Sequence, residues 1–355
     1  MAKRDPDKSA RNRIIENIKA ELRNILPDVI IATGAKNEAS LNSKLGSKHD
    51  EFFDLKTEKI GSHEEFINKW LQGLKARINT YYSPNHEWIY ENAKDHEIFR
   101  KYLLLFLKRS YLKHFDELSK NRPSPSKSEI WIGQTNANYG LLVTPRFKDG
   151  RWGNDKSEIR AFKHGYWTVG HVMEAGLVIP NKNKRFKFND IDQFLLFFTD
   201  TLVRNSGSQY EYALAEHYVD YVKNSDDPLN VPLMIPEFRY LGLEKAHQYR
   251  LDFMVVNPYT LDKVGFELSP WSTHGYLSRI KKLTQKKVNE MALHNFEKEM
   301  KKHRDYFKKH EVFTLIYTDE QLQDCEALFN NEMLPYLQPE KPATQLSFQI
   351  MEEFI

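Results

Sequence analysis

The spacing of apolar residues changes once along the chain, and this change constrains the fold more than any other feature. Before the change, apolar residues recur every three or four positions, for example from Ile14 to Ile25 and from Phe66 to Ile78, which predicts helices between Ser9 and Leu118. The segment Asn121–Lys127 contains two prolines and stops any helix. After it, short aromatic and β-branched segments alternate with Gly, Asn and Asp, which is typical of short strands. We therefore expect an α+β protein.

The predicted domain organisation follows from this break. We expect a helical N-terminal domain (1–122), a mixed α/β middle segment (128–205), a C-terminal α/β layer (206–338) and a peripheral tail (339–355). In the first domain we expect a flexible loop at 35–47. In the middle segment we expect strands at 129–133, 139–146, 157–162 and 177–179, and helices at 168–175 and 190–203. In the C-terminal layer we expect a helix at 209–223, an irregular proline-rich stretch at 228–237, a hairpin of strands at 247–256 and 263–269, a helix at 278–309, a strand at 312–317 and helical structure at 319–337.

Composition excludes several classes of protein. The chain has 355 residues, with 52 Lys or Arg and 49 Asp or Glu, so a net charge of +3 excludes a surface that is basic all over. Cys325 is the single cysteine, which excludes a disulfide framework and a cysteine-rich zinc site. Apolar runs are too short to cross a membrane, and the first residues lack the apolar core of a signal peptide. We expect a cytoplasmic protein without a membrane partner. Walker, Gly-x-Ser-x-Gly and His-Glu-x-x-His motifs are absent from the sequence.

The most informative local pattern is a pair of carboxylates in the predicted hairpin. If its turn is centred between Tyr259 and Thr260, then Asp252 and Glu267 lie directly opposite each other on one face. Such residues have Cβ atoms roughly 4.5–5.5 Å apart, where like charges repel. A hard divalent cation reverses this repulsion, because two carboxylates at that separation can share one Mg²⁺ or Mn²⁺. A purely structural explanation is two solvent-facing carboxylates, each with a basic neighbour.

A third carboxylate comes from the preceding helix. Glu211 is followed by Leu214, Ala215 and Tyr218 at helical spacing, which indicates a helix that packs on the sheet. Glu216 competes for the same role, but it lies about 140° around the helix from Glu211. We expect Glu211 to be the acid that faces the hairpin.

These residues resemble the PD-(D/E)xK nuclease superfamily, whose core has an acidic helix, a hairpin bearing Asp and then Glu-x-Lys, another helix and a further strand. The similarity spans about Ser206–Thr318 and includes Tyr-Glu211-x-x-Leu-Ala. It implies a restriction-endonuclease-like core in which Asp252 and Glu267 bind Mg²⁺ or Mn²⁺, with Glu211 assisting directly or through water. It further implies a metal-dependent endonuclease that hydrolyses phosphodiester bonds of double-stranded DNA, as restriction and anti-phage defence enzymes do.

The chain departs from the family at the lysine position, which holds Ser269. A serine hydroxyl supplies no positive charge near a phosphate, so another cation would have to serve. Arg250 would lie opposite Ser269 in the same register, and Lys286 and Lys287 begin the following helix. Gln285 could reach a base edge or a metal-bound water. The sequence leaves open a catalytically silent nucleic-acid-binding subunit and a protein-interaction module. A retaining glycosidase also uses two carboxylates about 5 Å apart, but the basic helix beside the site favours a polyanionic substrate.

Two basic regions are candidates for contact with DNA. Residues 279–310 carry eleven Lys or Arg and four Asp or Glu, and Lys281 and Lys282 lie nearest the hairpin. The same region would also suit a solvated helix with Met291 on a buried side. In the middle segment, Arg146, Arg151 and Arg160 lie among aromatic residues and glycines, which is typical either of nucleic-acid contact or of the basic rim of a β-rich core.

Two further possibilities concern partners. Residues 168–179 could form a recognition helix and wing. Besides DNA, a homodimer or an activating protein is a possible partner, and the N-terminal helices could dimerise, position DNA or bind another protein.

Overall fold

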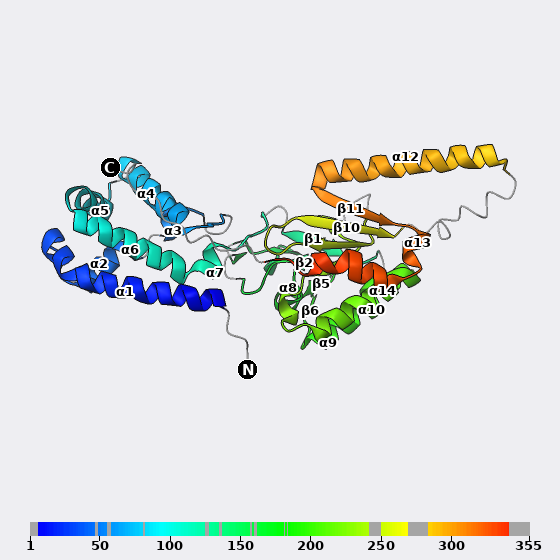
Figure 1. The fold of residues 1–355 in the computed structure, drawn as a ribbon, viewed down its shortest axis with the longest axis horizontal. Helices are drawn as coiled ribbons and strands as arrows, with labels where there is room; N and C mark the ends of the chain where they lie inside the picture. The colour runs from blue at the N-terminus through cyan, green and yellow to red at the C-terminus, as the bar shows by residue number, and fades with distance from the viewer. Residues whose placement is uncertain are drawn as a thin grey trace. The chain divides into compact units, whose positions relative to one another are not determined.

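The computed structural model of the chain contains two compact units, which are described separately (Figure 1). Within the described residues, the helical unit runs to Arg122 and the mixed unit runs from Pro123 to Glu340. The structure describes residues 6–46, 49–54, 58–80, 82–124, 128–134, 137–156, 158–159, 162–180, 182, 184–240, 250–268 and 283–340. The expected α+β class is confirmed at this coarse level. No described helix is long and apolar enough to cross a membrane.

The helical unit has the all-helical character that the spacing of apolar residues predicts. Its helices are α1 (Pro6–Thr33), α2 (Glu38–Leu45), α3 (His49–Phe52), α4 (His63–Thr80), α5 (Pro84–Asp95), α6 (Glu97–Lys113) and α7 (Phe115–Leu118). They share one hydrophobic core, in which Phe66, Trp70 and Phe99 are fully buried. The burial of such large side chains is the main stabilising contribution to a unit of this kind.

The predicted loop at 35–47 is wrong, because it contains helix α2. The Asn37 side chain caps this helix by accepting a hydrogen bond of 2.9 Å from the Ser40 N–H. Leu41 and Leu45, four residues apart, are completely buried. Because the three residues between them, Asn42, Ser43 and Lys44, are polar, this short helix with only two apolar anchors was not predicted.

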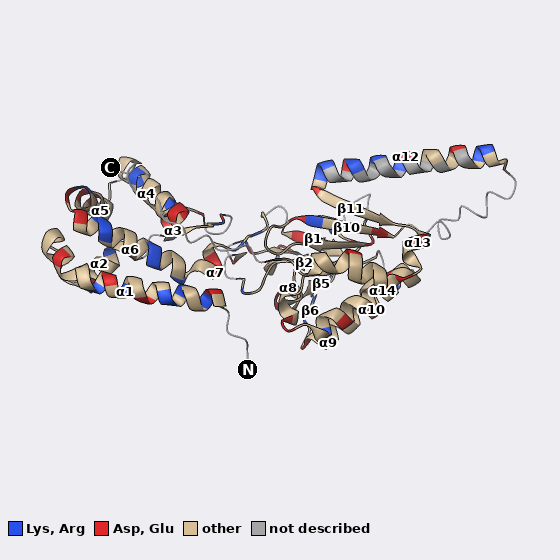
Figure 2. Ribbon diagram, in the orientation of Figure 1, with Lys and Arg blue, Asp and Glu red and all other residues tan. Residues whose placement is uncertain are grey.

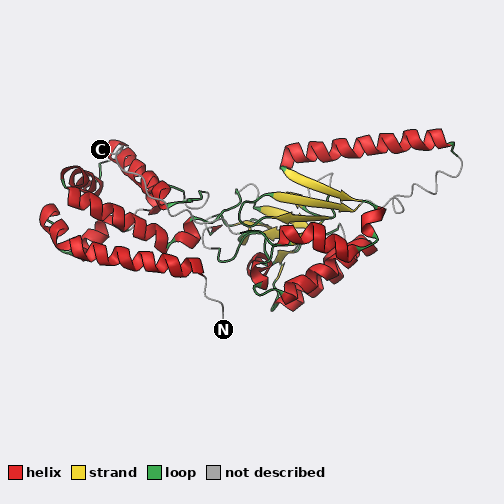
Figure 3. Ribbon diagram, in the orientation of Figure 1, coloured by secondary structure: helices red, strands yellow, loops and turns green. Residues whose placement is uncertain are grey.

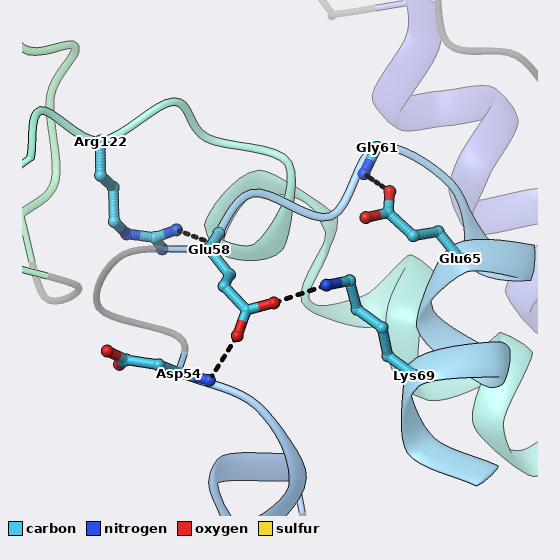
Figure 4. Close-up of polar contacts among 6 residues, drawn as sticks. All are labelled: Asp54, Glu58, Gly61, Glu65, Lys69 and Arg122. Atoms are coloured by element: carbon cyan, nitrogen blue, oxygen red, sulfur yellow. Dashed lines mark hydrogen bonds and ion pairs between the residues drawn. The ribbon is translucent and has the colours of Figure 1, made fainter. Parts of the chain in front are cut away.

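Hydrogen bonds join Arg122, at the boundary of the helical unit, to other residues of that unit (Figure 4). Glu58 accepts hydrogen bonds from Lys69 (2.5 Å) and from the Asp54 N–H (2.9 Å). The Arg122 guanidinium donates to the carbonyl oxygens of Glu58 (3.4 Å) and Glu117 (2.5 Å). Arg122 is therefore hydrogen-bonded both to the loop before α4 and to α7.

The mixed unit is built from two main sheets and a separate hairpin, with helices beside them (Figure 3). The antiparallel five-stranded sheet has the order β6 (Arg185–Phe186), β5 (Leu177–Val178), β2 (Tyr139–Leu142), β1 (Glu129–Ile132), β8 (Arg239–Tyr240). The four-stranded sheet has the order β11 (Val312–Tyr317), β10 (Lys263–Leu268), β9 (Phe253–Val256), β7 (Met234–Pro236), and only β10 and β11 are parallel. The hairpin pairs β3 (Pro145–Lys148) with β4 (Arg151–Asn154).

Helices lie beside these sheets, and several of them share one core with the strands. They are α8 (Val169–Ala175), α9 (Ile191–Phe197), the π-helical η3 (Phe198–Val203), the 3₁₀ turns η4 (Arg204–Ser206) and η5 (Pro228–Asn230), α10 (Gln209–Asn224), α12 (Gln285–His310), α13 (Asp319–Leu322), α14 (Cys325–Leu328), the π-helical η7 (Phe329–Met333) and α15 (Leu334–Leu337). Buried residues from Ile130 to Leu337 pack together, so the predicted middle and C-terminal segments share one hydrophobic core.

Two strand predictions are wrong. The described residues between 157 and 162, which are Glu158, Ile159 and Phe162, form no strand, and the strand lies earlier, at β4. The stretch predicted to be irregular at 228–237 contains β7. Pro236 is compatible with β7 because this strand lies at the edge of its sheet, where a missing N–H costs no ladder hydrogen bond.

The helix predicted at 168–175 is present with the expected ends, but most of its side chains are buried. Thr168 caps α8, and Gly176 ends it with a φ of 70°. Val169, His171 and Val172 are buried, so α8 belongs to the core and cannot enter a DNA groove as a recognition helix.

Candidate active site

The β9–β10 hairpin has the register that the sequence predicts. Phe253 pairs with Phe266 and Val256 with Lys263. One step beyond the last pair, the same register brings Asp252 opposite Glu267. The Asp252 Oδ2 accepts a hydrogen bond of 2.6 Å from the Leu268 N–H, so its carboxylate turns toward the end of β10. Both acids are partly buried at the end of the hairpin.

Strand β7 leads to a further acid, Glu237. Asp252, Glu267 and Glu237 are called the acidic row. Pro236 of β7 pairs with Phe253, and the next N–H, that of Glu237, donates to the Asp252 carbonyl at 3.2 Å. Glu237 has a φ of 49°, at the point where the chain leaves the four-stranded sheet and enters the other sheet as β8. Sequence analysis missed this acid because it missed β7. The signal was the apolar run before Glu237, which resembles a strand that ends in an acid.

Helix α10 supplies the fourth acid. Glu211 lies in its first turn, where its N–H donates to the capping Ser208 hydroxyl at 3.3 Å. Its side chain is buried, and the nearby Ser206 and Ser208 side chains act to lower its pKa. Glu216 is exposed, as expected for the far side of the helix. Of these two acids, Glu211 is therefore the buried one.

The pKa values of these acids show that their charges are poorly compensated. Burial, followed by the charges of Asp252 and Glu237, raises the pKa of Glu211 to about 8. Burial raises the pKa of Asp252 to about 7, against the Leu268 hydrogen bond, and the Glu237 charge adds to the rise. Burial also raises the pKa of Glu237, which nearby arginines oppose. A cluster of this kind suits either proton transfer near neutral pH or the binding of a cation.

Two arginines and one glutamine surround Glu237. Gln134 donates to it at 2.7 Å, and an Arg250 nitrogen lies 3.8 Å from its other oxygen. Arg239 is 3% exposed and donates to the Gly133 carbonyl (2.5 Å) and to the Asn138 side chain. Burial, and then Arg250, lowers the pKa of Arg239 to about 10. Arg250 was a predicted site residue, whereas Arg239 was missed because β8 was not foreseen.

The remaining predicted catalytic residues are Ser269, Gln285, Lys286 and Lys287. Ser269 lies outside the described residues. Gln285, Lys286 and Lys287 are exposed at the start of α12, and within the described part of the chain neither lysine forms an ion pair with these acids.

Two of the five predicted DNA-contacting residues are described, and both lie on the β3–β4 hairpin of the mixed unit. Arg160, Lys281 and Lys282 are outside the described residues, while Arg146 and Arg151 are exposed on the β3–β4 hairpin. Met291 of α12 is 40% exposed rather than buried as expected.

Neither a preformed metal site among the described residues nor a known relative identifies the chemistry of these acids. Among the described residues, no group of three or more His, Cys, Asp or Glu side chains is arranged to hold a metal ion. No protein-family model, curated protein or solved structure matches the chain. The chemistry of the site is therefore inferred from its own residues.

Proposed function

We propose that the protein is a Mg²⁺- or Mn²⁺-dependent endonuclease of the PD-(D/E)xK type, which hydrolyses phosphodiester bonds of double-stranded DNA in restriction or anti-phage defence. The observation that carries the proposal is that Asp252 comes opposite Glu267 at the end of the hairpin, with the buried Glu211 of the preceding helix near enough to Asp252 for its charge to raise the pKa of Glu211. The described acids do not already form a closed set of three metal ligands, so the cation would have to draw them together. The order α10, β7, β8, β9, β10, α12, β11 supports it, because apart from β7 and β8 it follows the helix, hairpin, helix and strand expected of a restriction-endonuclease-like core.

The donor set suits a hard divalent cation. Asp252, Glu267 and Glu211 offer only carboxylate oxygens, which Mg²⁺ and Mn²⁺ prefer. The raised pKa values of Asp252 and Glu211 reflect repulsion and burial that a cation would relieve. When bound, such a metal supplies an activated water and offsets negative charge on the phosphate.

The chain's own residues have separate roles in this proposal. Asp252 and Glu267 would hold the cation, and Glu211 would assist from α10. The Leu268 N–H orients the Asp252 carboxylate, and the Ser208 hydroxyl caps the helix end that carries Glu211. Gln134 and the two arginines keep Glu237 in place beside them. Ligands fixed by surrounding hydrogen bonds hold a metal more firmly than free ones.

Arg250 is the best-supported source of the positive charge that Ser269 lacks. It lies close to the acidic row through Glu237, whereas Lys286 and Lys287 project into solvent. A guanidinium stabilises charge on a phosphate but is a poor proton acceptor. We expect Arg250→Ala to reduce the cleavage rate about 100-fold and Lys286→Ala or Lys287→Ala to reduce it less than about threefold.

The basic helix supports a polyanionic substrate. The described exposed cations of α12 are Lys286, Lys287, Lys298, Lys301, Arg304, Lys308 and Lys309 (Figure 2). A helix of 26 residues is about 39 Å long, which is comparable to one turn of duplex DNA. Phosphodiester hydrolysis fits this setting better than glycoside hydrolysis.

A second candidate function is a catalytically silent nucleic-acid-binding subunit. The serine at position 269 favours it, because a loss of the lysine removes catalysis more readily than it removes binding.

The test is incubation of the purified protein with supercoiled plasmid and with phage DNA, in Mg²⁺, Mn²⁺ or chelator. We expect cutting that requires the metal and that Asp252→Ala and Glu267→Ala each reduce at least 100-fold without loss of folding. Asp220→Ala, on the exposed side of α10, is the matched control. Full activity in either site variant would refute the site, and salt-dependent binding without any cutting would favour the silent subunit.

A further inference from the structure

The β3–β4 hairpin has two chemically different faces. Strand alternation puts Arg146 and Lys148 of β3 and Arg151 of β4 on one face, and all three side chains are exposed. Lys148 and Arg151 are a directly opposed pair, where like charges destabilise a hairpin. The remaining position of that face is Gly153, which has open space around it. This arrangement of like charges does not stabilise the hairpin itself.

The opposite face anchors the hairpin to the body of the mixed unit. Phe147 and Trp152 are opposed there, with ring centroids 5.4 Å apart. The Trp152 indole donates to the Lys182 carbonyl at 3.1 Å, and Asn154 donates to the Ser128 carbonyl at 2.8 Å. The turn residues Asp149 and Gly150 have φ values of 53° and 76°, as in a tight two-residue turn. The cationic face is therefore held on a rigid support.

A second basic segment lies against this hairpin. The Arg185 guanidinium is 5.6 Å from the Trp152 ring and donates to the Pro145 carbonyl at 3.4 Å. Lys182, Lys184 and Lys187 of the same segment are exposed. Residues 145–156 and 182–187 together contain eight Lys or Arg and two Asp, a net charge of +6, although the whole chain carries +3. One of the two acids, Asp155, is paired with Arg146 at 3.3 Å.

We infer that this surface, formed by residues 145–156 and 182–187, binds the phosphate backbone of duplex DNA at a site separate from the acidic row. Duplex DNA carries one charge per about 1.7 Å of its axis, and residues two apart on a strand are about 6.7 Å apart, so neighbouring cations of the hairpin can each meet a phosphate. Cationic side chains dominate this surface, and one of its two carboxylates is paired with Arg146, so its role is to hold and orient the substrate. The inference depends on the proposed function only in taking the polyanion to be DNA.

The test measures binding of the full chain to a fluorescein-labelled 30-base-pair duplex by anisotropy, in chelator, from about 50 to 300 mM salt. The triple variant Arg146→Glu, Lys148→Glu, Arg151→Glu should bind at least tenfold more weakly at low salt. The slope of log Kd against log salt should fall by about 2 to 3, at about 0.9 per lost phosphate contact. The triple variant Arg146→Lys, Lys148→Arg, Arg151→Lys should bind like the wild type.

A matched control keeps the result specific. Arg13→Glu, Arg23→Glu, Lys75→Glu makes the same change in charge at exposed positions of the helical unit, and it should bind within about twofold of the wild type. If charge reversal unfolds the hairpin, the corresponding glutamine variant replaces it. Equal binding by the wild type and the hairpin variant, equal loss in the hairpin and control variants, or no duplex binding by the wild type would overturn the inference. Hairpin-dependent binding without metal-dependent cutting would refute the proposed endonuclease and leave this surface standing.

Discussion

Asp252 has two roles that act in opposite directions on stability. One of its oxygens accepts the Leu268 N–H at the end of the β9–β10 ladder, which stabilises the hairpin. Its charge, however, is buried beside Glu237 and Glu211, so its pKa rises to about 7. Residues that weaken the fold in this way are typical of functional sites, where a ligand later compensates them.

The pH dependence follows from the direction of this shift. Between pH 4 and 7 the folded protein holds a proton on Asp252 that the unfolded chain has lost, so the free energy of unfolding falls as the pH rises. Asp252→Asn keeps the acceptor for Leu268 and removes the charge. We expect it to raise stability by about 1–3 kcal/mol at pH 8 in chelator and by little at pH 4. Thermal melts at both pH values, with Asp220→Asn as the exposed control, check this. Equal melting temperatures for Asp252→Asn and wild type at pH 8 would contradict it.

At the scale of elements, the register of the β9–β10 hairpin could be predicted, because opposed apolar residues and the Asn257-Pro258 turn fix it. Strand β7 could not be predicted, since Pro232 before it and Pro236 within it argue against a strand, and only its edge position permits Pro236. Glu237 and Arg239, which flank the passage from one sheet to the other, were missed for the same reason. Helix α2 was not predicted, because polar residues surround its two buried leucines.

Gly265 sets the close contact between the two strands that position the acids. A Cβ at this position would lie 2.3 Å from the Leu251 side chain, which is completely buried and adjoins Asp252. We expect Gly265→Ala to cost about 1–3 kcal/mol in stability and to reduce cleavage, because Leu251 must shift. Gly153→Ala on β4, where nothing lies within 4 Å, is the matched control and should be close to neutral. Denaturant unfolding measures both, and equal stability in the two variants would show that this contact is unimportant.

At the scale of the whole molecule, the sequence break at Asn121–Lys127 lies beside the division between the two units. Separate segments at 128–205 and 206–338 were predicted from the sequence, but their residues share one core. The sequence could not show this, because contacts such as that between Phe198 and Tyr218 depend on how helices pack in three dimensions.

Because each unit has its own hydrophobic core, the mixed unit should fold alone. We expect a fragment of residues 123–341 to unfold in a single cooperative transition and to retain the metal-dependent activity of the full chain. Circular dichroism melts and the plasmid assay check this. A fragment that lacks a cooperative transition would mean that the helical unit is needed for the fold.

The most direct test of the central claim, that Asp252, Glu267 and Glu211 bind a divalent cation, is calorimetric titration of Mn²⁺ into the protein at pH 6.5 and 8 in buffers of different ionisation enthalpy. With pKa values of about 7 and 8, Asp252 and Glu211 are mostly protonated at pH 6.5 and should release protons as the cation binds. We therefore predict one site whose affinity rises with pH, with about one to two protons released at pH 6.5. Asp252→Asn and Glu267→Gln should each weaken it at least tenfold. Absence of Mn²⁺ binding, or binding that neither variant alters, would contradict the account.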